Sequence, residues 1–164
     1  MFSGGATDQT DEAAEPIEST EPPAAASPAR PVTTEAGRYL RATAHYEPPA
    51  HHGVMDDSAA RMWEIAFGLA VRLRYASGAP LTEITRMVAT AVRDRCAAAV
   101  PPLDAEMLVR EALGETVPVG EMDQARRIMV HLLVFAALID ELALGDAELD
   151  ALIAEAEELA AAGA

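Results

Sequence analysis

Histidine and aspartate side chains near the start of the sequence are its clearest candidates for metal chemistry. His45, His51 and His52 lie close together and are followed by Asp56 and Asp57. Imidazole nitrogens and carboxylate oxygens are common ligands of zinc and other transition metals. These histidines, however, occur in a proline-containing segment, and no two of them are four residues apart on a predicted helix. We therefore expect neither a preformed metal site nor a cofactor.

The remaining histidine, His131, lies in the apolar stretch RRIMVHLLVFAALIDEL, residues 126–142. A buried histidine is usually neutral and bonded through a ring nitrogen to a carbonyl or carboxylate oxygen, and we predict this role for His131. The alternative is that His131 lines an apolar pocket between helices. In that case Trp63 and Phe135 are the candidate neighbours in the pocket.

Catalytic motifs are missing from the rest of the sequence. Its single cysteine, Cys96, excludes an internal disulfide and is predicted to be a small buried hydrophobic residue on one helix face. The sequence contains no glycine-rich phosphate loop before a helix, no GxSxG and no HExxH. Its paired carboxylates are adjacent in sequence and so point in different directions on a helix. We therefore predict that the protein is not an enzyme.

The apolar stretch that contains His131 must be covered by other elements. Between the arginines and acids at its two ends it has twelve residues without charge, whereas a membrane span needs roughly 20. Its apolar side chains cover every direction of a helical projection, which is typical of a buried helix. We predict that residues 126–142 form the central helix of the protein and that no membrane is involved.

Helical periodicity extends over most of the remaining chain. Apolar residues at spacings of three and four predict helices near residues 58–76, 80–100 and 104–113, then at 122–144 and after Gly145. No segment alternates long enough to predict a strand. The expected fold is all-α, a single bundle of about five helices over residues 54–164, preceded by a disordered arm.

Two segments precede the predicted bundle. Residues 1–37 are rich in Pro, Ala and acidic side chains and have few large apolar ones, so we predict a disordered acidic arm. Residues 38–53 hold two of the three tyrosines and three of the four histidines. This segment is either a linker or a docking segment, and its aromatic side chains would contact a partner or the protein's own first helix.

The charge of the chain restricts its partners. The net charge is −15, and an acidic surface repels phosphate backbones, so direct nucleic-acid binding is not expected. A basic protein partner would be attracted. The N-terminus has neither the basic nor the apolar region of a secretory signal, so we expect a cytoplasmic protein. All twelve basic residues are arginine and there is no asparagine, which indicates a GC-rich bacterial genome.

These features predict a regulatory or adaptor protein that binds another protein through its helical bundle and N-terminal arm. The candidate partner-binding residues are Tyr39, Leu40, Arg41 and Tyr46, because tyrosine and arginine often dominate interface energies. The alternative function is a helical bundle that binds a small molecule in the apolar pocket near His131.

Overall fold

A computed structural model describes residues 30–47, 56–95, 97 and 99–163. Within these residues the chain forms helices and no strands, so the predicted all-α class is confirmed, with six helices instead of about five. The helices, in chain order, are α1 (Glu35–Ala44), α2 (Asp57–Arg74), α3 (Leu81–Asp94), α4 (Pro102–Ala112), α5 (Gln124–Leu142) and α6 (Asp146–Ala162).

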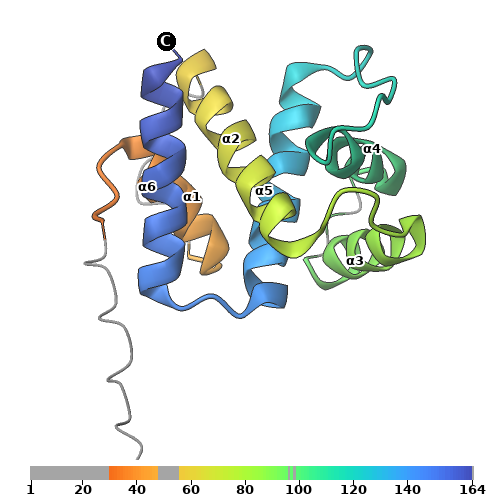
Figure 1. The fold of residues 1–164 in the computed structure, drawn as a ribbon, viewed down its shortest axis with the longest axis horizontal. Helices are drawn as coiled ribbons and strands as arrows, with labels where there is room; N and C mark the ends of the chain where they lie inside the picture. The colour runs from red at the N-terminus through yellow and green to blue at the C-terminus, as the bar shows by residue number, and fades with distance from the viewer. Residues whose placement is uncertain (1–29, 48–55, 96, 98, 164) are drawn as a thin grey trace, which may run out of the picture.

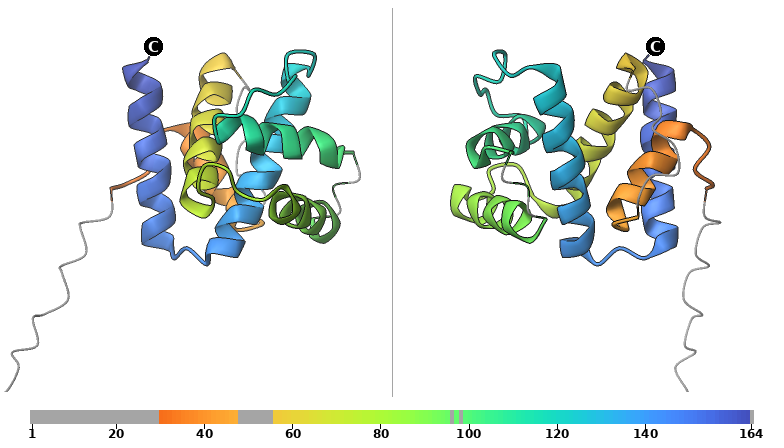
Figure 2. Two further views of the ribbon diagram at one scale, coloured as in Figure 1. Left: turned by 45° about the vertical axis from the view of Figure 1, so that its right-hand side comes forward. Right: turned by 180° about the vertical axis from the view of Figure 1, so that it is seen from behind.

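The most extensive packing between helices joins α2 to α5 and α2 to α6 (Figure 1). On one side of the α2–α5 pair, α1 lies against α2, α5 and α6. On the other side, α3 and α4 pack against each other and against α5 (Figure 2). The bundle therefore has two groups of helices, α1 with α6 and α3 with α4, which α2 and α5 hold together.

Local capping fixes the starts of several helices. The side chain of Asp56 accepts a hydrogen bond from the backbone of Ala59 at the start of α2, at 2.8 Å. Asp123 does the same for Arg126 in α5, at 2.9 Å. Both are N-caps, which satisfy backbone donors that have no partner within the helix. Hydrogen bonds that reach only three residues along the chain therefore define where α2 and α5 begin.

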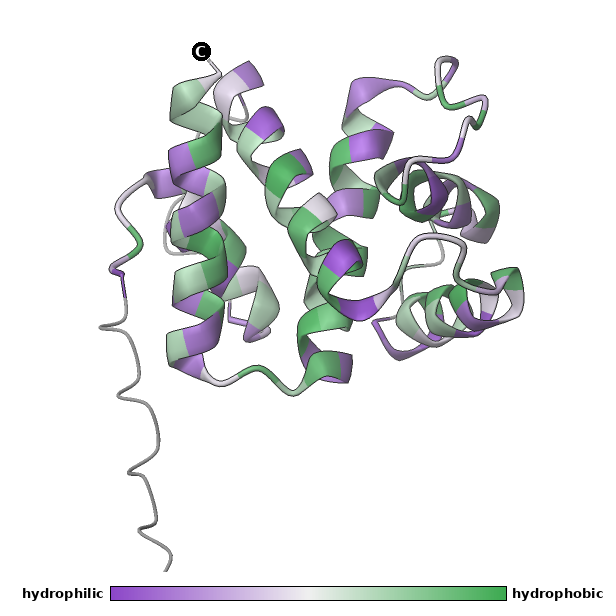
Figure 3. Ribbon diagram, viewed as in Figure 1, coloured by the Kyte–Doolittle hydropathy of each residue, from purple (hydrophilic) through white to green (hydrophobic). Residues whose placement is uncertain are grey.

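The central position of α5 agrees with its apolar sequence. It contacts α1, α2, α3 and α4, and Val134, Phe135 and Leu138 are fully buried. Apolar residues cover most of α5, whereas α6 carries many hydrophilic ones beside its apolar face (Figure 3). One edge of α5 is nevertheless open to solvent at Met129. None of the described helices is long and apolar enough to span a membrane.

The sixth helix, α1, corrects the predicted division of the chain. Residues 35–44 were divided between a disordered arm ending at residue 37 and a linker or docking segment over 38–53, but they form a helix in the core. Leu40 is 0% exposed. The indole nitrogen of Trp63 donates to the carbonyl of Ala36 at 3.0 Å, and the rings of Tyr39 and Trp63 are 5.2 Å apart. Residues 1–29 and 48–53 lie outside the described residues.

A buried carboxylate attaches the start of α1 to α6. Glu157 accepts hydrogen bonds from the backbone nitrogens and the hydroxyls of both Thr33 and Thr34, at 2.7–3.2 Å. Burial by itself would raise the pKa of Glu157, but these hydrogen bonds outweigh it and lower the pKa below its ordinary value of 4.5. Thr34 also caps α1, since its hydroxyl accepts from the backbone of Gly37. The last residues of the predicted arm are therefore part of the fold.

We expect Glu157→Gln to lower the free energy of unfolding by about 2 kcal/mol, the scale of hydrogen bonds to a charged group. Because the folded pKa of Glu157 is depressed, its ionisation stabilises the fold above pH 4.5 and this contribution is lost as pH falls below that value. The acid limb of the stability profile should therefore be flatter in the variant. Urea unfolding at several pH values measures both effects.

Glu158→Gln is the matched control for that experiment. Glu158 is the next residue, but its side chain is exposed in a surface ion pair with Arg30. Such pairs contribute little, so this variant should lose well under about 1 kcal/mol. Equal losses in the two variants would contradict the structural role of Glu157.

Candidate functional site

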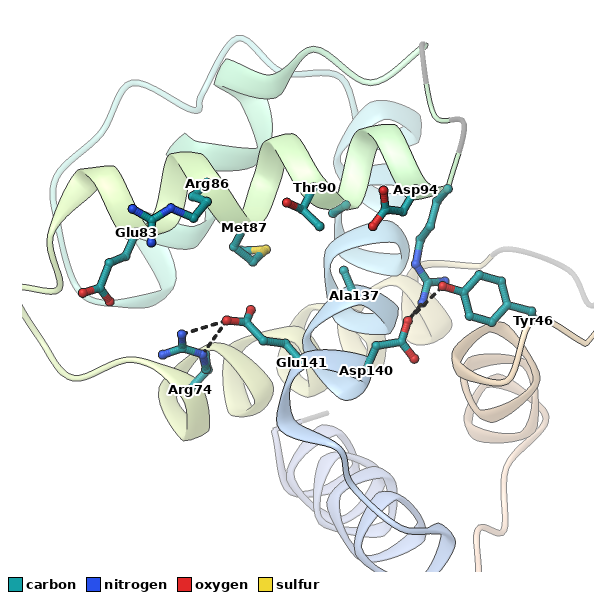
Figure 4. A pocket seen from close by; sticks show the side chains of 12 residues that line it. Tyr46, Arg74, Glu83, Arg86, Met87, Thr90, Asp94, Ala137, Asp140 and Glu141 are labelled. Carbon is teal, nitrogen blue, oxygen red and sulfur yellow. Dashed lines mark hydrogen bonds and ion pairs between the residues drawn. The ribbon is translucent and has the colours of Figure 1, made fainter.

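A groove lies between α3 and the C-terminal ends of α2 and α5 (Figure 4). Its volume is about 600 Å³. The side chains that line it come from the segment after α1 and from three helices: Tyr46, Arg74, Glu83, Arg86, Met87, Thr90, Ala91, Asp94, Arg95, Ala137, Asp140 and Glu141. Residues far apart in the sequence therefore meet at this surface.

The groove has an apolar floor and charged walls. Met87 of α3 faces Ala137 of α5 across the floor (Figure 4), and both Met87 and its neighbour in the lining, Ala91, are buried. Two ion pairs connect neighbouring elements beside it. Arg74 of α2 pairs with Glu141 at 2.7 Å, and Arg95 pairs with Asp140 at 2.7 Å. This combination of apolar floor and polar rim resembles the make-up of protein interfaces more than that of an enclosed small-molecule cavity.

Tyr46 stands at one end of the groove in an unusual backbone conformation. Its φ is 58°, in the left-handed region where glycine is normally found. The backbone nitrogen of Glu47 donates to the carbonyl of Ala42, and that of Tyr46 donates to Thr43, which is the Schellman pattern at the end of α1. A bulky residue at the glycine position of this motif costs roughly 1 kcal/mol.

The Tyr46 ring is positioned by two groups of the groove. Its hydroxyl donates to Asp140 at 2.9 Å, and the guanidinium of Arg95 lies 4.0 Å from the ring centroid. Desolvation and then the hydrogen bond to Asp140 raise the pKa of the phenol, so it remains a protonated donor at neutral pH. Despite these contacts Tyr46 is 63% exposed. A fixed and exposed aromatic ring is therefore available beside the groove.

The structure separates the four predicted partner-binding residues. Leu40 is a core residue, and Tyr39 packs on Trp63. Arg41 bonds to Asp150 of α6 at 2.6 Å. These three positions therefore contribute to the attachment of α1, and Tyr46 is the member of the set that lines the groove.

The structure also separates the three predicted pocket residues. His131 lines a pocket of about 640 Å³ on the side of α5 that faces α2. Trp63 lines a different and smaller pocket of about 160 Å³, next to Tyr39. Phe135 is fully buried in the core. The described residues therefore do not form a common pocket around all three side chains, which was the alternative predicted from the sequence.

His131 itself is buried, as predicted. It is 3% exposed, and its ring stacks on Phe67 with a centroid distance of 4.7 Å. Burial, and then the nearby charge of Arg127, lower the pKa of His131 to about 4. The imidazole is thus neutral at pH 7. The predicted hydrogen bond from its ring to a carbonyl or carboxylate is not formed with any of the described residues.

The candidate metal ligands are only partly within the described residues. The Nε2 atom of His45 lies 3.4 Å from a carboxylate oxygen of Asp146. His51, His52 and Cys96 lie outside the described residues. Among the residues that the structure describes, no group of three or more histidine, cysteine, aspartate or glutamate side chains is placed to hold a metal ion.

Comparison with known proteins gives no relative: no family model, curated protein or solved structure matches this chain. The function of the chain is therefore inferred from the geometry of the groove. The sequence did not predict most of the groove residues, including Arg74, Arg95 and Glu141. In the sequence they look like ordinary solvated charges at helix ends. The only local signal was the concentration of aromatic residues that includes Tyr46.

Proposed function

We propose that this protein is a non-enzymatic adaptor or regulatory protein that binds a segment of a protein partner in the groove between α3 and α5. The observation that carries the proposal is Tyr46, held in a left-handed conformation with its ring 63% exposed at the end of the groove. Backbone strain of this kind persists where the side chain is needed, and tyrosine is among the residues that contribute most to interfaces.

The charge of the whole chain supports a basic partner segment. The charges of the groove itself nearly cancel, because Arg74 pairs with Glu141, Arg95 pairs with Asp140 and Asp94 pairs with Arg93, which leaves Glu83 and Arg86. The net charge of −15 attracts a basic chain over a longer range. Apolar side chains of the partner would lie on Met87 and Ala91. Association should accordingly weaken as ionic strength rises.

Tyr46→Ala tests the proposal. We expect it to reduce recovery of the partner from an extract of the native host at least tenfold, because the variant loses the exposed ring. Leu103→Ala is the matched control. Leu103 is also 63% exposed, but it lies on α4 and does not line the groove. The proposal fails if the two variants recover the same proteins in the same amounts.

Tyr46→Gly separates the backbone of this position from its ring. We expect the glycine variant to be about 1 kcal/mol more stable than Tyr46→Ala, because glycine adopts a φ of 58° without strain. Both variants should nevertheless lose the partner equally. Thermal unfolding and recovery of the partner, measured on the same preparations, check the two expectations. Retained binding in the glycine variant would show that the ring is not needed.

A further inference from the structure

A second pocket shares no lining residue with the groove. It has a volume of about 640 Å³ and lies where α2, α4, α5 and α6 meet. Its lining includes Arg61, Phe67, Gly68 and Arg72 of α2 and His131 of α5. The volume is within the ordinary range for small-molecule sites, roughly 300–1,000 Å³. A ligand bound in this pocket would not contact the residues of the groove.

His131 gives this pocket a buried polar group without a protein partner. Its ring nitrogens make no hydrogen bond with any described residue. Among those residues, the hydroxyl of Tyr75 is the one fully buried side-chain polar atom that lacks a hydrogen-bond partner. The unbonded nitrogens of His131 are therefore not fully buried. They reach the open space of this pocket or of a neighbouring pocket of about 380 Å³, which His131, Arg61 and Glu64 also line. Since buried polar groups are usually hydrogen-bonded, an acceptor in the pocket would supply the hydrogen bond that the His131 ring lacks.

Two arginines make the pocket locally positive. Within the part of the chain that the structure describes, neither Arg61 nor Arg72 forms an ion pair. Arg72 donates only to the carbonyl of Ala112, at 3.3 Å. Of the two acids in the pocket, Glu111 is paired with Arg127 at 3.4 Å. The single charge of Glu64 then remains to offset the two positive charges of Arg61 and Arg72. The resulting excess of one positive charge matches a ligand with one negative charge.

Gly68 keeps one wall of the pocket open. It is buried in the middle of α2, where glycine costs about 1 kcal/mol relative to alanine. The three atoms nearest to a Cβ atom added there all belong to the Arg72 guanidinium, at 3.3–3.6 Å. The missing side chain therefore lets this guanidinium lie close against α2, at the wall of the pocket.

The rest of the pocket is apolar. Phe67 and Leu108 are buried, and Leu159 of α6 is partly exposed at the edge. We propose that this pocket binds a small monocarboxylate with an apolar body, whose carboxylate contacts Arg61, Arg72 and the imidazole of His131. The ring of Phe67 and the side chain of Leu159 then contact the apolar body. The proposal does not depend on the partner groove.

Nuclear magnetic resonance of the full chain with labelled histidine side chains tests the proposal, with octanoate as the probe. We expect octanoate to shift the His131 resonances saturably below about 10 mM, the range of a weak small ligand. Octanol has the same apolar body without the charge and should bind at least tenfold more weakly. No saturable shift with octanoate overturns the proposal. An equal response to octanol, or a tighter response to inorganic phosphate, overturns the assignment to a monocarboxylate.

Two variants locate the binding. Arg72→Gln removes one guanidinium and should weaken octanoate binding at least tenfold, whereas Arg93→Gln, an exposed arginine of α3 outside both sites, should leave it unchanged. Gly68→Leu should fill the pocket and abolish the His131 shift while the helical circular dichroism spectrum is kept. Unchanged octanoate affinity in Arg72→Gln, or in a folded Gly68→Leu variant, places the ligand elsewhere and contradicts the site.

Discussion

Leu40→Ala is expected to lower the free energy of unfolding by about 2–5 kcal/mol, the range for large-to-small substitutions in a core. Leu40 is 0% exposed, on a helix that packs against α2, α5 and α6. Removing its side chain leaves a cavity among residues of three other helices, so the whole bundle should lose stability. Denaturation in urea, with the midpoint and slope fitted separately, measures the loss.

Leu73→Ala is the control for this substitution, because Leu73 is 57% exposed at the end of α2. Its loss should stay within about 0.5 kcal/mol, as for most surface changes. If Leu40→Ala cost as little, α1 would not belong to the cooperatively folded unit. Residues 38–44 would then belong to the linker or docking segment that the sequence predicted over residues 38–53, and Leu40 would again be a candidate for partner contact.

His131 should make the stability of the protein depend on pH. Its pKa is about 4 in the folded protein and about 6.5 when unfolded, so between these values the unfolded chain binds more protons. Stability is therefore fully present above pH 6.5 and falls as pH decreases toward 4, by about 3 kcal/mol in total. Most of this loss comes above about pH 5, before the acid limb assigned to Glu157.

His131→Gln should remove this dependence while keeping the acid limb below pH 4.5. Unfolding in urea at closely spaced pH values from neutral to acid distinguishes the two contributions. The same steep loss in the variant would mean that another group carries it. The charged groups that line the two pockets next to His131 are Asp57, Arg61, Glu64, Arg72, Glu111 and Arg127.

The two proposed sites share helices but not side chains. Both use α2 and α5, yet the groove takes Arg74 and Glu141 at one end of these helices, whereas the pocket takes Arg61 and His131 at earlier positions. Variants at one site should therefore leave the other intact. Loss of the partner in Tyr46→Ala with octanoate binding retained would show that the sites act independently.

The sequence alone determined the all-α class and five of the six helices. Their apolar spacing is a local property. The caps at Asp56 and Asp123 are equally local, since their hydrogen bonds reach only three residues along the chain, but only the structure identified these two residues as caps. The apolar run around His131 likewise predicted a buried helix and a buried histidine. Each of these conclusions depends on residues within one or two turns of each other.

The tertiary structure alone decided the place of α1 and the make-up of both sites. A ten-residue helix is marginal by itself, and α1 is attached by the bonds of Thr33 and Thr34 to Glu157, over 120 residues away in sequence. The groove likewise depends on Arg74 meeting Glu141, 67 residues later. Such pairings carry no periodic signal, because they arise only once packing brings the helices together.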